Sequence, residues 1–210
     1  MSAPTVTARA RRAIRLEQFT IGYNVVEMAI AVTAGLAAGL ISLVGFGVDS
    51  GIEVAAATVV LIRLYAEVRG GEPDEVKERR ALKFIAVTFF ALAAYVTYEG
   101  IRRLAGEETP ETSLVGIVLL AASVVVMPLL ARAKRRAGEA LGSRLVIADA
   151  NETRLCAWLS VSTLIGLLAL AAFGWTWVDA VAGFVIAGFA VMEGREAWEG
   201  ELTCDDDECS

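Results

Sequence analysis

Long apolar runs separated by short charged stretches dominate the hydrophobic pattern of this chain. Six runs can be drawn, at about residues 19–39, 43–67, 82–104, 113–130, 144–173 and 177–198. Most of them reach the roughly 20 residues that an α-helix needs to cross about 30 Å of hydrocarbon. Because the runs lack the alternation typical of β-barrel strands, only helices can satisfy their backbone hydrogen bonds in lipid. The pattern therefore predicts an all-α, polytopic membrane protein with six transmembrane helices.

The basic residues between the runs indicate the orientation in the membrane. Lys and Arg gather before the first run and after the second and fourth, whereas the opposite side carries only Arg102 and Arg103. The positive-inside rule then places both termini in the cytoplasm. We expect a multi-pass protein of the cell (inner) membrane with a basic cytoplasmic arm at 1–18, a transmembrane domain at 19–200 and an acidic tail at 201–210.

Composition narrows the class of protein further. The chain is 56% hydrophobic, whereas soluble domains are about 45–50% apolar. Its basic residues lie in short connections and not along a groove with interleaved aromatics, which speaks against a nucleic-acid partner. No G-x-x-x-x-G-K-[ST] motif occurs, so we do not expect transport driven by ATP hydrolysis in this chain. We expect no enzymatic activity, no catalytic residues and no bound organic cofactor.

Two pairs of ionisable residues interrupt the second and fifth runs. Asp49 and Glu53 form one pair and Glu152 and Cys156 the other, each with i, i+4 spacing that puts both side chains on one helix face. At a rise of about 1.5 Å per residue, Glu53 lies about 15 Å from one membrane face and Cys156 about 18 Å from the other. Ionisable groups at this depth are costly and by default mark an ion or substrate path. The two pairs can meet near the midplane if their helices touch.

These side chains favour a divalent metal as the transported substrate. The chain has no histidine, so a metal site must use carboxylates, the thiol, amides, backbone or water. Zinc accepts Asp, Glu and Cys ligands and is the first expectation, with manganese, iron, cobalt or cadmium as alternatives. Because these ligands bind metal only after losing their protons, metal and protons compete for one site. That competition is a direct route to metal–proton exchange.

Several polar groups near this site leave alternatives open. Asn24 and Glu27, in the first run, could serve as accessory site residues, as a proton relay or as a helix–helix hydrogen bond. Cys156 could be a ligand or a small buried apolar residue, and Asp49 could be a cap. Arg154 lies between the members of the second pair and could neutralise Glu152.

Two further features have simpler readings. Asp179 opens the sixth run, where a helix N-cap is the expected role, and Glu193 near its inner end is expected at the membrane interface. In the tail, Cys204 and Cys209 flank four acidic residues, a composition that fits either metal binding or a disordered acidic tail.

The two interrupted runs resemble the cation diffusion facilitator family. The stretch Gly-Phe-Gly-Val-Asp-Ser-Gly-Ile-Glu at 45–53 is similar to the family's Asp-Ser-x-x-Asp segment, and Ala-Asp-Ala-Asn-Glu-Thr-Arg-Leu-Cys at 148–156 opens the fifth run. The resemblance covers about residues 16–200. It implies export of divalent metals in exchange for protons, usually by a homodimer.

The resemblance also implies site residues. By position Asp49 and Glu53 match the family's pair in the second span, whereas Glu152 stands where the family usually has His and Cys156 where it usually has Asp. The family's usual cytoplasmic domain has no counterpart before residue 210, so we expect a divergent, membrane-only member.

Sequence and resemblance together predict a divalent metal transporter that works by proton antiport through Asp49, Glu53, Glu152 and Cys156. Two other classes stay open. An organic cation–proton exchanger would use the same acidic groups but needs a roomy aromatic-lined cavity, and the chain is only 8% aromatic. A membrane sensor or scaffold that transports nothing would use the tail as its metal-responsive part.

Overall fold

The computed structural model of the chain describes residues 3–69, 75–105 and 110–199. Within these ranges the backbone is helical and forms no β-strand. The helices are α1 (Ala3–Ala38), α2 (Ile41–Val68), α3 (Glu75–Leu104), α4 (Leu114–Leu141), α5 (Arg144–Phe173) and α6 (Trp177–Glu199). Each contains a segment long and apolar enough to cross a membrane. The predicted all-α fold with six membrane-spanning helices is therefore confirmed.

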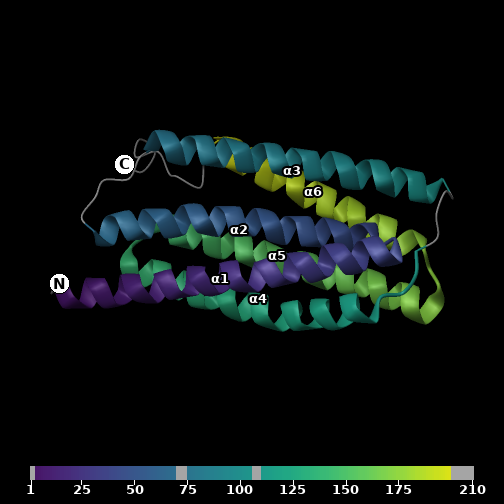
Figure 1. Cartoon of the computed structure of the whole chain (residues 1–210), viewed down its shortest axis with the longest axis horizontal. Helices are drawn as coiled ribbons and strands as arrows, with labels where there is room; N and C mark the ends of the chain where they lie inside the picture. Colours follow the sequence, from purple (N-terminus) through teal and green to yellow (C-terminus); the bar gives the residue numbers. More distant parts are fainter. Residues whose placement is uncertain (1–2, 70–74, 106–109, 200–210) are drawn as a thin grey trace.

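The helices pack as antiparallel neighbours in three close pairs. These pairs are α1 with α2, α4 with α5, and α3 with α6. Contacts of α1 with α4 and of α2 with α5 join the first two pairs into a four-helix group, and the α3–α6 pair lies along one side of it (Figure 1). Because α2 and α5 both also contact α6, these two helices stand between the group and the outer pair.

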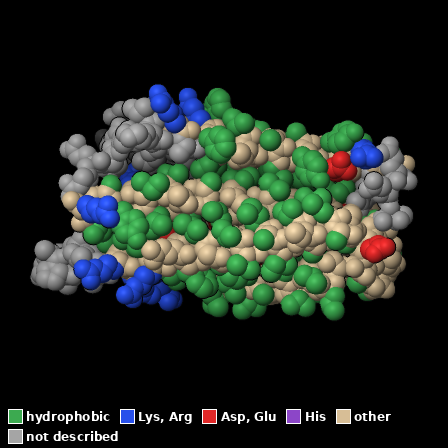
Figure 2. Space-filling model, viewed as in Figure 1, with side chains coloured by type: hydrophobic (Ala, Val, Ile, Leu, Met, Phe, Trp, Pro, Cys, Tyr) green, Lys and Arg blue, Asp and Glu red, His purple; other side chains and the backbone are tan. Residues whose placement is uncertain are grey.

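The surface matches a bundle surrounded by lipid. Hydrophobic side chains cover the middle of the bundle, and blue Lys and Arg side chains gather mainly at one end (Figure 2). This is the end at which α1 begins and α6 ends (Figure 1). The basic end is the one that the sequence analysis assigns to the cytoplasm.

Three helices extend beyond their apolar runs, and one of them is α3, which begins at Glu75. α1 begins at Ala3, so residues 3–18, expected as an arm, form its first part. α4 continues to Leu141, so the basic stretch expected as a loop after residue 130 is helical. The extensions of α1 and α4 are rich in Ala and Arg, which are strong helix formers. They also pack together, since Ala13 and Ala137 belong to one buried cluster.

The connection between α1 and α2 depends on two glycines. A Cβ on Gly35 would lie 2.7 Å from Cγ2 of Val44 and 2.8 Å from its backbone nitrogen. The absence of a side chain at Gly35 therefore lets α1 pack closely against α2. Gly39 instead adopts a positive φ of 62° in the turn itself, a conformation that glycine reaches without steric cost.

Aromatic rings cluster at the turn between α5 and α6. Trp175 stacks on Phe173 with ring centroids 4.9 Å apart, and on Trp177 at 6.0 Å. The turn lies at the end of the bundle opposite the basic residues (Figure 1). A position at a helix end is what an interfacial aromatic belt requires.

Candidate functional site

The two pairs singled out in the sequence lie in the interior between α2 and α5. Asp49 and Glu53 on α2 are 8% and 2% exposed, and Glu152 and Cys156 on α5 are 8% and 3% exposed. Glu53 and Cys156 each lie 12 residues after the start of their helix, which is about 18 Å along the axis. Because α2 and α5 are antiparallel and in contact, the two pairs face each other at about the same depth.

The Cys156 thiol lies beside both carboxyl groups of the α2 pair. Glu53 and Asp49 are both among its charged neighbours. Oε1 of Glu53 accepts a hydrogen bond of 2.8 Å from the Thr153 hydroxyl. The other carboxylate oxygen of Glu53 is buried and has no hydrogen-bond partner among the described residues. One carboxylate oxygen of Glu53 is thus hydrogen-bonded to α5, and the other is available to bind a cation.

The four side chains do not form a closed coordination shell. In the described ranges, no three His, Cys, Asp or Glu side chains are placed so that they could hold one metal ion. Glu152 has the carboxyl groups of Glu193, Asp149 and Glu53 among its charged neighbours. Buried carboxylates that face each other repel unless they carry protons or a cation. A metal site at these residues therefore stays a prediction at this point.

Glu27 forms helix–helix hydrogen bonds, which is one of the three roles considered for it from the sequence. It accepts a bond of 2.9 Å from the Ser50 hydroxyl on α2 and another from the Ser123 hydroxyl on α4. It is also a charged neighbour of Glu53. Asn24, one turn away on α1, is fully buried, and neither atom of its amide has a partner in the described part of the chain. Glu27 therefore borders the α2 pair, and Asn24 lies one turn before it on the same helix.

A buried cation that the sequence analysis missed lies next to this site. Nζ of Lys134 on α4 lies 2.5 Å from Oδ2 of Asp149 and 3.0 Å from Oε2 of Glu17. It also donates to the Thr153 hydroxyl at 3.2 Å, and that hydroxyl in turn donates to Glu53. Lys134 is fully buried. The network thus connects all four helices of the inner group to one member of the α2 pair.

The sequence offered only a weak signal for this network. Lys134 stands in a run of basic residues that was read as a loop, and it is buried because α4 continues through that run. Asp149 lies i, i+4 before Thr153 on α5, so both face the same side as the second pair. A helical spacing test across the basic run would have shown that position 134 continues the buried face of Met127 and Leu130.

Glu193 on α6 is a second residue near the site that the sequence analysis did not propose. It was expected near the membrane interface, and in the fold its side chain is buried, with one carboxylate oxygen that has no partner in the described residues. It is a charged neighbour of both Asp49 and Glu152. The signal in the sequence was its helical spacing, because position 193 continues the buried face of Ala182, Ile186 and Ala190.

Asp179 caps a different helix from the one expected. It lies in the first turn of α6, but its carboxylate accepts hydrogen bonds from the backbone amides of Ile41 at 3.1 Å and Ser42 at 3.3 Å. It also accepts from the Ser42 hydroxyl. Asp179 therefore satisfies free amides at the start of α2, which fixes α6 against the helix that carries the first pair.

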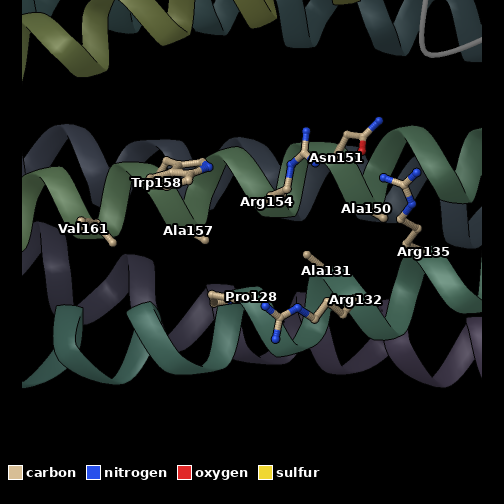
Figure 3. A pocket seen from close by; sticks show the side chains of 10 residues that line it. All are labelled: Pro128, Ala131, Arg132, Arg135, Ala150, Asn151, Arg154, Ala157, Trp158 and Val161. Atoms are coloured by element: carbon tan, nitrogen blue, oxygen red, sulfur yellow. The ribbon is translucent and has the colours of Figure 1, made fainter.

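Arg154 does not neutralise the second pair. It is exposed and lies in an outer groove between α4 and α5, together with Arg132 and Trp158 (Figure 3). No described ion pair joins Arg154 to Glu152 or to another carboxylate of the described ranges. The remaining expectation, metal binding by the Cys204–Cys209 tail, falls outside the residues that the structure describes.

The fold and the buried polar layer define a class of multi-pass membrane protein with ionisable groups at mid-depth, which is typical of transporters. Comparison with known proteins gives the family. Residues 81–199 match the cation efflux transmembrane domain. Because this match covers more than half of the chain, the protein belongs to the cation efflux (cation diffusion facilitator) family. The matched region contains Glu152 and Cys156 and begins after the α2 pair.

Two curated relatives extend the likeness toward the N-terminus. An uncharacterized transporter of Methanocaldococcus jannaschii is 31% identical over 173 residues, which cover 78% of this chain and 59% of the relative. An uncharacterized transporter of Synechocystis sp. is 22% identical over 192 residues, which cover 89% of this chain and 61% of the relative. The chain thus spans about three fifths of the length of these relatives. The predicted resemblance to the family is confirmed.

Proposed function

We propose that this chain moves divalent metal ions across the cell (inner) membrane in exchange for protons. Asp49, Glu53, Glu152 and Cys156 are the groups that bind the ion. One observation carries the proposal: the carboxyl groups of Asp49 and Glu53 are buried at mid-helix beside the Cys156 thiol of the facing helix. A membrane protein tolerates such a cluster at this depth where an ion or proton path needs it.

The mixture of carboxylate oxygens and one sulfur favours a metal ion between the hard and the soft cations. Carboxylates suit hard cations and a thiolate suits softer ones, and zinc accepts both. Glu193 adds a carboxylate from a third helix, so an ion bound between Glu53 and Glu152 would also be approached from α6. We therefore expect zinc as the first substrate, with manganese, iron, cobalt and cadmium as the metals to compare.

Proton exchange follows from the crowding of acidic groups. Asp49, Glu53 and Glu152 each have Glu193 as a charged neighbour. Lys134, a cation that acts on Glu53 and Glu152, is already paired with Glu17 and Asp149. Without a metal, protons are the counter-charge that limits repulsion among these carboxyl groups. Metal entry would displace those protons, and metal release would allow them to return.

The proposal includes two identical chains, on the strength of the family. Its exchange mechanism does not depend on this, because all proposed ligands come from α2, α5 and α6 of one chain.

The test is metal flux into proteoliposomes that contain the purified full chain, with and without an imposed pH gradient. Zinc, manganese, iron, cobalt and cadmium are offered in turn. We expect flux of at least one metal to depend on the gradient and to vanish in Asp49→Asn, which keeps the shape of the side chain. The matched control is Glu139→Gln, an exposed carboxylate that pairs with Arg135 outside this layer.

Three results would contradict the proposal. Metal flux that is unchanged in Asp49→Asn would contradict the assignment of the site. Metal flux that does not depend on the pH gradient would contradict the antiport mechanism. Absence of flux for every metal, in protein shown to be folded, would favour the organic-cation or sensor readings.

A further inference from the structure

An open groove lies on the outer face of α4 and α5, away from the buried carboxyl groups of the proposed cation site. It encloses about 390 Å³, within the range of about 300–1,000 Å³ that small-molecule sites occupy. Three arginines, an asparagine and a tryptophan line it together with five apolar residues (Figure 3). Arg132 and Arg135 come from α4, and Asn151, Arg154 and Trp158 from α5.

The positive charge of this groove is largely uncompensated. Arg135 pairs with Glu139 at 3.1 Å, in an exposed contact. The described residues offer no carboxylate within ion-pair distance of Arg132 or Arg154. An arginine on a lipid-facing position of a membrane-spanning helix is costly unless its head reaches the interface or finds an anion. The groove therefore favours a negatively charged ligand.

The depth of the arginines in the membrane indicates how a bound lipid would be oriented. Arg154 is ten residues from the start of α5 and Arg132 nine residues from the end of α4, so they lie about 14–15 Å from those ends. These helices, at about 42–45 Å, exceed the hydrocarbon thickness of about 30 Å. With the hydrocarbon centred on the helices, the arginine backbones lie roughly 7–8 Å inside it, and their side chains can extend toward the headgroups at the basic end.

The other residues of the groove add an apolar part to the basic part formed by the arginines. Farther from the basic end than the arginines, the groove continues along Pro128, Ala157, Val161 and Trp158, to the left in Figure 3. An anionic phospholipid has the matching chemistry, with a phosphate that accepts bidentate hydrogen bonds from arginine and an acyl chain for the apolar part. A second copy of this chain fits less well, because the basic end would bring like charges together (Figure 2).

We propose that the groove between α4 and α5 binds one anionic phospholipid, with its headgroup phosphate held by Arg132, Arg135 and Arg154. The acyl chain lies against Trp158 and Pro128. The bound lipid neutralises Arg154, which lies on the face of α5 opposite Glu152 and Cys156, together with the two arginines of α4. It therefore stabilises the position of α5 from outside. The site is separate from the proposed cation site, and either proposal can fail without the other.

The experiment uses quenching of Trp158 by brominated lipid in vesicles that contain the full chain. Brominated phosphatidylglycerol and brominated phosphatidylcholine are compared at equal bromine content, and the Trp158 signal is the difference between wild type and Trp158→Phe. Each arginine near an anionic lipid is worth about fivefold in binding. We expect phosphatidylglycerol to quench with a relative binding constant roughly 25-fold or more above that of phosphatidylcholine.

Matched variants assign this preference to the groove. Arg132→Gln with Arg154→Gln should lower it by about 25-fold. Arg11→Gln with Arg136→Gln removes the same charge from exposed positions at the same end, outside the groove lining, and should leave the preference unchanged. Failure of soluble glycerol phosphate to reverse the quenching would support a lipid as the ligand.

The opposing outcomes are distinct. Equal quenching by both lipids, or a preference that survives loss of Arg132 and Arg154, would overturn the proposal. Reversal by soluble glycerol phosphate would assign the groove to a free anion. Protection of Trp158 from both lipids would mean that another copy of the chain covers the groove.

Discussion

Replacement of Lys134 by methionine should destabilise the protein more than any other single change of a basic residue in the described helices. The Lys134 side chain is fully buried, and its Nζ lies 2.5 Å from Asp149 and 3.0 Å from Glu17. Both carboxylates are themselves buried. Methionine keeps most of the volume but leaves two acidic groups without their shared cation. Removing one partner of such a buried pair costs roughly 3–5 kcal/mol.

The assay is the free energy of unfolding in detergent, from a denaturant titration followed by far-ultraviolet circular dichroism. The matched control is Arg135→Met at the next position of α4, where the ion pair with Glu139 is more than half exposed. Exposed pairs contribute about 0–1 kcal/mol, so this variant should unfold close to wild type. Combining Lys134→Met with Glu17→Gln and Asp149→Asn should recover much of the loss, because no uncompensated charge remains.

A loss in Lys134→Met within about 1 kcal/mol of the control would refute the reasoning. It would mean that Lys134 reaches solvent or that its two partners are already neutral. A triple variant no more stable than Lys134→Met would likewise contradict the account, since the cost would then come from packing and not from charge.

Three further outcomes are expected. Cys156→Asp should retain metal flux but shift the preference toward harder metals such as manganese, because an oxygen ligand replaces sulfur; an unchanged metal profile would mean that the thiol does not bind the ion. Glu193→Gln should weaken metal uptake in the proteoliposome assay, whereas Glu199→Gln, exposed at the end of the same helix, should not; equal effects would remove α6 from the path. Gly35→Ala should cost about 1–3 kcal/mol of unfolding free energy, because its Cβ would overlap the backbone of α2. Gly188→Ala, which meets nothing within 4 Å, should be neutral or stabilising by up to about 1 kcal/mol; a reversed order of these two glycine variants, in thermal unfolding, would count against the packing shown at α1 and α2.

The apolar runs predicted the helix bounds well where a helix ends together with its apolar run. α5 has the expected bounds, since Ser143 caps its start and Gly174 its end. The starts of α1 and α3 and the end of α4 were missed because helices there continue through charged segments. Hydropathy marks the part of a helix that lies in lipid, whereas helix propensity and packing decide where the helix ends.

The candidate site was predictable in part for a similar reason. Asp49, Glu53, Glu152 and Cys156 stand out because a charge or thiol in an apolar run is visible without a structure. Lys134 did not, because its neighbours in sequence are also basic and its burial depends on how α4 packs against α1 and α5.

Asp179 and Glu193 show the same limit of sequence reasoning. The sequence indicates that each lies near a helix end, but their roles depend on α2, which is more than a hundred residues away in the chain. Long-range packing of this kind leaves little trace in a single sequence.

The central claim is that the α2 and α5 pairs jointly hold the transported metal, and the X-ray absorption spectrum of bound zinc tests it most directly. The sample is the full chain with Cys204 and Cys209 replaced by serine, so that Cys156 is the remaining thiol. The account predicts one sulfur neighbour at about 2.3 Å with oxygen ligands around it. That sulfur signal should disappear in Cys156→Ser, and zinc binding should be lost in Asp49→Asn with Glu53→Gln. A shell of oxygen ligands alone, unchanged in all of these variants, would contradict it.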